Sequence, residues 1–105
     1  MLGQKAYGWE HWSHEYDFAQ PVTVQVKNRD VFVEVALTSW TGEGESDYSS
    51  GHIGIVQMVS DSGVENFPLF DYHQARFGKN VTSVTVQIFT SDAAARGRLI
   101  INYWS

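Results

Sequence analysis

Alternation of apolar and polar side chains is the feature of this chain that most limits its fold. Apolar residues occupy every second position from 22 to 26 and again from 31 to 37, and the polar stop Asn28-Arg29-Asp30 separates the two runs. A period of two places every second side chain on one face of a β-strand, whereas a helix repeats every 3.6 residues. The pattern therefore predicts two half-buried strands joined as a hairpin, with the valines of both strands facing inward.

The same period recurs along the rest of the chain. Residues 53–60 and 64–70 flank Asp61-Ser62-Gly63, whose glycine tolerates a positive φ, so these residues are expected to form a second hairpin. Pro68 has no backbone N–H to donate, and its strand is therefore expected at an edge of the sheet. Further strands are predicted at 12–18, with an aromatic inner face, at 81–90 and at 98–104.

These strands define the predicted fold class. No segment carries apolar residues at helical spacing over three turns, and the 105 residues contain no cysteine for a disulfide framework. A chain of this length forms one domain that is stabilised by apolar packing. We predict a single all-β domain over residues 1–105, a small antiparallel β-sandwich of jelly-roll or immunoglobulin-like type with six to eight strands. A small β-barrel is the alternative.

Charge and hydropathy exclude several classes of partner. Seven basic and twelve acidic side chains give a net charge of -5, which disfavours binding to nucleic acid phosphates. The chain lacks the roughly 18 consecutive apolar residues that a membrane span needs. It also begins without the apolar segment of a secretory signal. The sequence thus predicts a soluble protein that is cytoplasmic as synthesised, and it leaves the final location open.

Aromatic residues in polar loops suggest a binding function. Four tryptophans, five tyrosines and six phenylalanines are more than a core of this size is expected to hide. An exposed aromatic ring beside polar side chains is suited to the flat face of a sugar. We predict a non-catalytic recognition module for a carbohydrate or another small polar ligand. The predicted binding residues, in loops between strands, are Trp40, Tyr48, Tyr72, His73 and Arg76.

Two segments carry ligands for a metal ion. Glu43, Glu45 and Asp47 lie in a glycine-rich loop and could supply oxygen ligands to calcium, although their spacing does not match an EF-hand. A solvated acidic loop is the alternative interpretation of this segment. His11 and His14 belong to the second segment, and a metal-dependent hydrolase using them is the weakest functional hypothesis. A strand would place these histidines on opposite faces, with His14 on the core side.

Assembly is the remaining hypothesis for the exposed aromatic residues. Edge strands and an aromatic patch would then be buried in a homo-oligomer or in a larger particle. Pro68 at a predicted edge argues against open-ended strand pairing.

Overall fold

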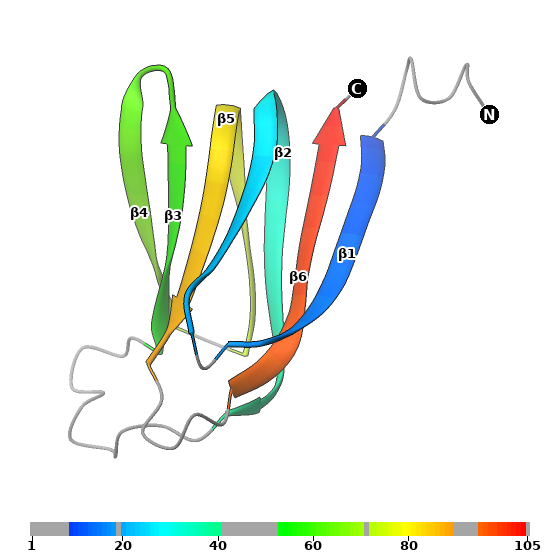
Figure 1. The fold of residues 1–105 in the computed structure, drawn as a ribbon, viewed down its shortest axis with the longest axis vertical. Coiled ribbons are helices and arrows are strands. Elements are labelled where there is room, and N and C mark those ends of the chain that lie inside the picture. The colour runs from blue at the N-terminus through cyan, green and yellow to red at the C-terminus, as the bar shows by residue number, and fades with distance from the viewer. Residues whose placement is uncertain (1–8, 19, 41–52, 71, 90–94, 105) are drawn as a thin grey trace.

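The computed structural model describes residues 9–18, 20–40, 53–70, 72–89 and 95–104. The strands are β1 (Trp9–Asp17), β2 (Val22–Trp40), β3 (Gly54–Ser60), β4 (Gly63–Leu69), β5 (His73–Ile88) and β6 (Ala95–Trp104). They form one antiparallel sheet in the order β1-β6-β2-β5-β3-β4 (Figure 1). No helix occurs within the described ranges, so the all-β prediction is confirmed.

The two longest strands bend and divide this sheet into two layers. In β2 the bend lies at Lys27 and Asn28, whose φ angles of 58° and 56° fall in the left-handed region. In β5 it lies at Asn80, with a φ of 53°. The register between the two strands also shifts between Gln25 and Val31. Left-handed residues and bulges bend a strand sharply, and both strands turn over at the same end of the molecule (Figure 1).

Each half of a bent strand belongs to a different layer. The β1 layer contains β1, β6, residues 31–40 of β2 and residues 73–78 of β5. The β4 layer contains residues 22–25 of β2, residues 81–88 of β5, β3 and β4. Counting each bent strand twice gives eight strands in the order of a jelly roll. The sandwich prediction is confirmed in its jelly-roll form.

The predicted hairpin around residues 28–30 is wrong in one respect. The polar stop turns β2 into the other layer instead of back onto itself, because both halves of β2 find an antiparallel partner in β5. The hairpin between β3 and β4 is confirmed, with Gly63 at a φ of 132° after the turn. Pro68 lies in β4, which is an edge strand as predicted.

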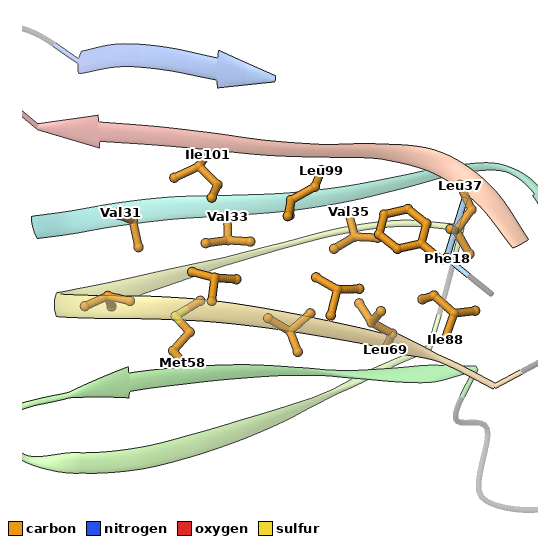
Figure 2. Close-up of a cluster of buried hydrophobic side chains, with 14 of the residues drawn as sticks. Phe18, Val31, Val33, Val35, Leu37, Met58, Leu69, Ile88, Leu99 and Ile101 are labelled. Atoms are coloured by element: carbon orange, nitrogen blue, oxygen red, sulfur yellow. The ribbon is translucent and has the colours of Figure 1, made fainter. Parts of the chain in front are cut away.

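The core lies between the layers, where side chains from both point toward one another (Figure 2). The predicted inward valines at 31, 33 and 35 are buried, which confirms the alternation. Burying each such side chain contributes about 1.5–3 kcal/mol relative to exposure. The β1 layer contributes Val31, Val33, Val35, Leu99 and Ile101, and the β4 layer contributes Val56, Met58, Val84 and Val86.

Strand β5 begins earlier than the sequence pattern indicates. The segment from residue 71 to 77 has no apolar alternation and was expected to be a connection between strands, but it is strand from His73 onward. Strand geometry places His73, Ala75 and Phe77 on one face and Gln74 and Arg76 on the other. This alternation decides which polar residues share a surface.

Candidate functional site

The outer face of the β1 layer carries a grid of side chains from four strands. Residues that lie directly opposite one another in the sheet form its rows. We call this surface the β1 face. Its first row is His11, Asn102, Phe32 and Phe77, and its second row is Ser13, Ile100, Glu34 and Ala75.

Two phenylalanines form the apolar part of the β1 face. Phe32 is 40% exposed and Phe77 is 50% exposed, and the two residues are directly opposite each other on β2 and β5. We call them the Phe pair. Opposite residues in an antiparallel sheet have Cβ atoms about 4.5–5.5 Å apart, so the two exposed side chains are neighbours on this face.

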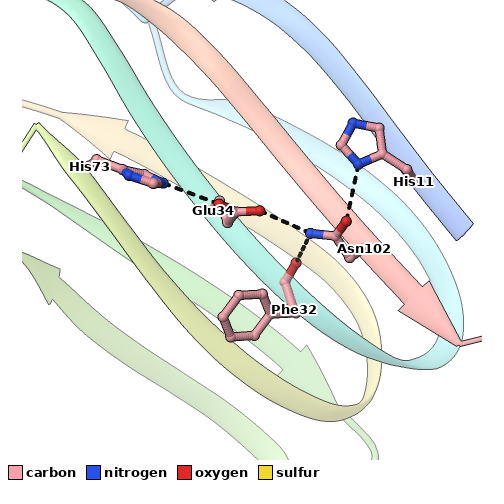
Figure 3. A network of polar contacts seen from close by, with 5 residues as sticks. All are labelled: His11, Phe32, Glu34, His73 and Asn102. Atoms are coloured by element: carbon pink, nitrogen blue, oxygen red, sulfur yellow. Dashed lines mark hydrogen bonds and ion pairs between the residues drawn. The ribbon is translucent and has the colours of Figure 1, made fainter. Parts of the chain in front are cut away.

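A hydrogen-bonded row of polar side chains lies beside Phe32 (Figure 3). Glu34 Oε1 accepts from His73 Nε2 at 3.1 Å, and Glu34 Oε2 accepts from Asn102 Nδ2 at 3.0 Å. Asn102 Oδ1 in turn accepts from His11 Nδ1 at 3.0 Å. We call these four residues the polar row. The carboxylate is thus held from both sides, and its orientation is fixed before any ligand arrives.

The exposure of the polar row leaves it accessible to a ligand. The side chain of His73 is 63% exposed and that of Glu34 is 24% exposed. An ion pair with this much solvent contact contributes only about 0–1 kcal/mol to stability. Ala75 lies directly opposite Glu34, and its short side chain leaves the carboxylate uncovered on that side. The polar row therefore offers a held carboxylate acceptor and the second ring nitrogen of each exposed histidine.

The predicted binding residues separate into three groups. Tyr72 is 45% exposed, and its carbonyl accepts from the Leu37 N–H, so it lies at the start of β5 beside His73. Arg76 lies on the other face of β5, where its guanidinium carbon is 4.1 Å from the centroid of the Phe67 ring. The structure therefore brings His73 and Tyr72 to one region and directs Arg76 away from His73.

The remaining predicted residues are not placed. Trp40 ends β2, but its side chain lies outside the described residues, as do Tyr48 and the candidate calcium ligands Glu43, Glu45 and Asp47. The calcium site stays a prediction.

The two histidines of β1 lie on opposite faces, as a strand requires. His11 belongs to the polar row, whereas the His14 ring contacts Tyr16 at 4.7 Å and Trp12 at 6.0 Å between centroids. His14 is exposed rather than buried in the core, because β1 is an edge strand and its inward side is covered only in part. Within the described ranges, no three His, Cys, Asp or Glu side chains are grouped so as to hold a metal ion.

Sequence reasoning missed the Phe pair, although the sequence contains a signal for one of its members. Phe32 stands at an outward position between the inward residues Val31 and Val33, and a large aromatic residue at such a position points to a surface. Phe77 lacks that signal because its segment shows no alternation. Only the pairing of β2 with β5 makes the two residues neighbours.

The chain was compared with known proteins at three levels. No protein-family model, no curated protein and no solved structure matches it. The part of the chain that the structure describes has no helix long and apolar enough to cross a membrane.

Proposed function

We propose that this protein is a non-catalytic recognition module whose β1 face binds carbohydrate. The observation that carries the proposal is the Phe pair beside the preorganised polar row. The C–H face of a sugar ring packs on an aromatic ring, and the sugar hydroxyls exchange hydrogen bonds with carboxylate, amide and imidazole groups. Rigid strands hold both groups, which lowers the entropy lost on binding.

The charge of the site favours a neutral glycan. Glu34 is an acceptor with two oxygens already aligned, and it suits hydroxyl donors. An acidic polysaccharide would be repelled by this carboxylate and by the net charge of -5. The grid extends over four strands, so an oligosaccharide lying across the strands would contact more of the β1 face than a single sugar.

A glycan array tests this proposal with matched variants. Wild-type protein is expected to bind a set of neutral oligosaccharides, and Phe77→Ala is expected to lose most of that signal because the stacking surface is removed. Val64→Ala is the control, because Val64 is an equally exposed apolar residue, at 55%, on β4 in the other layer. Its array signal should equal that of wild type.

Two outcomes would contradict the proposal. One is an array on which wild-type protein binds nothing, and the other is a Phe77→Ala signal equal to that of wild type. If the Phe pair instead joins two copies of the chain, sedimentation will show a dimer that Phe77→Ala converts to monomer. A stable dimer of this kind would bury about 800 Å² on each partner.

A further inference from the structure

A cleft of about 200 Å³ opens between the two layers at the edge next to β1. We call it the interlayer cleft. It is separate from the β1 face, because its residues belong to the inward side of β1 and β6 and to the first half of β2. Its lining consists of Trp12, Val24, Gln25, Val26, Lys27, Arg29, Ile101 and Tyr103.

The corresponding seam at the other edge of the sandwich is closed. There Arg76 covers Phe67, and the Gln74 side chain donates to the Pro68 carbonyl at 2.8 Å and accepts from the Phe70 N–H at 2.8 Å. About 10 Å³ remains at that seam, no more than a single water molecule needs. An open cleft at the β1 edge is therefore a local property of its residues and not a general consequence of the fold.

Within the described ranges, two cations at the interlayer cleft, Lys27 and Arg29, have no acidic partner. The Arg29 guanidinium carbon lies 4.5 Å from the centroid of the Tyr103 ring, which holds this side chain at the cleft. The neighbouring carboxylate, Asp30, is engaged by the backbone N–H of Asn80 at 3.0 Å. Among the described residues, neither Lys27 nor Arg29 pairs with a carboxylate. In a chain with a net charge of -5, this local positive charge selects for an anion.

The backbone conformation of Lys27, at the cleft, is a second observation. Lys27 adopts a φ of 58°, in a region that residues with a β-carbon other than Asn and Asp rarely occupy. A glycine would adopt this conformation without strain. Residues held in strained conformations cluster at ligand sites, and Lys27 is one of the residues that line the cleft.

We propose that the interlayer cleft binds a small carboxylate carried on a single six-membered ring. A closed cavity of about 150 Å³ accommodates benzene, so this cleft has room for one ring and its carboxylate. Trp12 and Tyr103 pack against the ring, and Lys27 and Arg29 pair with the carboxylate. The ring belongs to an aromatic acid or to a uronic sugar. This site is independent of the β1 face and of the function proposed above.

Titration calorimetry with small probes tests the ligand chemistry. Benzoate and glucuronate represent the two sources of a ring carboxylate, and at least one of them is expected to bind saturably. Benzamide keeps the ring without the charge, and acetate keeps the charge without the ring, so both should bind about tenfold more weakly or not at all. Equal binding of benzoate and benzamide, or no binding of either carboxylate, would overturn the proposal.

Variants locate the binding event. Lys27→Gly removes the amine while allowing the same backbone conformation, and Arg29→Gln removes the second charge. Each variant is expected to lower the affinity for the carboxylate that binds wild-type protein about tenfold. Lys79→Gln is the matched control, because Lys79 is an exposed cation in the bend of β5 that does not line the cleft. If Lys79→Gln and Lys27→Gly lose carboxylate affinity equally, the protein attracts the probe only through its general charge, and the proposed site is wrong. Phe77→Ala should leave carboxylate binding unchanged.

Discussion

The outer faces of the two layers carry rows of side chains in the same arrangement but with different chemistry. Across the β4 layer the row is Asn66, Gln57, Thr85 and Thr23, which we call the β4 row. Its members bond to one another: Gln57 Nε2 donates to Asn66 Oδ1 at 3.2 Å, and the Thr23 and Thr85 hydroxyl oxygens are 2.9 Å apart. The β1 face instead places Glu34, two histidines and the Phe pair in equivalent positions.

This difference separates side chains that stabilise the sheet from side chains whose contribution to stability is smaller. Hydroxyl and amide pairs across strands stabilise a sheet and tolerate solvent, so the β4 row is accounted for by stability. The two phenylalanines bury only part of their surface, at 40% and 50% exposure, and exposed ion pairs contribute about 0–1 kcal/mol, so these side chains stabilise the fold less than core residues do. The β1 face is therefore the surface to which we assign the proposed binding function.

The largest expected effect concerns the backbone under the β1 face. In Gly97→Ala the new Cβ would meet the backbone of Ala36 and Leu37, because β6 and β2 approach closely at this point. We expect a loss of about 3 kcal/mol in the free energy of unfolding, measured by urea denaturation. Gly63→Ala in the β4 layer is the comparison: no atom lies within 4 Å of its Cβ, and only its φ of 132° is unfavourable, so its loss should be smaller. Equal losses of stability in Gly97→Ala and Gly63→Ala would show that the close approach of β6 and β2 does not determine the loss at Gly97.

The second effect should distinguish the two faces by binding. Phe32→Ala is expected to lower glycan affinity about tenfold, corresponding to about 1.4 kcal/mol, and to lower stability by about 1–2 kcal/mol because the ring is partly buried. Thr85→Ala should leave glycan affinity unchanged, because it removes a hydrogen bond from the β4 row worth about 1 kcal/mol and touches no part of the β1 face. Parallel glycan titrations and urea denaturation check both. A loss of glycan affinity in Thr85→Ala would contradict the assignment of glycan binding to the β1 face alone.

The third effect is the coupling between His73 and Glu34. A double-mutant cycle with His73→Ala and Glu34→Ala should give a coupling free energy below about 1 kcal/mol in unfolding, because the His73 side chain is 63% exposed. Glycan affinity should fall in each single variant. Glu34→Ala removes the acceptor, and His73→Ala removes a hydrogen bond that orients it. A coupling above about 2 kcal/mol with normal glycan binding would make the polar row structural, like the β4 row.

The smallest effect concerns the bend that separates the two faces. Lys27→Gly relieves the left-handed φ of a lysine but adds freedom to the unfolded chain, so these terms nearly cancel. We expect a change of less than about 1 kcal/mol in the free energy of unfolding, in either direction. A larger loss would mean that the lysine side chain, rather than the backbone geometry, maintains the bend.

The strands follow from the sequence wherever one face is buried and the other is wet. Residues 31–37 and β3 show this, because burial of one face imposes a period of two. Residues 73–78 escaped prediction because they pair at the edge of the β1 layer, where Ala75, Arg76 and Phe77 are all exposed. Without a buried face, a strand leaves no periodic pattern.

The candidate site depends on contacts that no local pattern contains. His73 was selected from its segment as a polar residue able to bind a ligand, but its partner Glu34 is 39 residues away in sequence. His11 and Asn102 are 91 residues apart. These pairings depend on the jelly-roll order of the strands, and several topologies are compatible with the same alternation. The sequence could therefore nominate single residues but could not assemble the β1 face.

Chemical-shift mapping by NMR tests the contrast between the two faces most directly. The labelled protein would be titrated with the neutral oligosaccharide that gives the strongest array signal, with backbone and aromatic side-chain resonances assigned. We predict that the perturbed residues cluster on the β1 face, at Phe32, Glu34, Phe77 and Asn102, while Gln57 and Thr85 stay unchanged. Perturbations centred on the β4 row, or no perturbation on either face, would contradict the account.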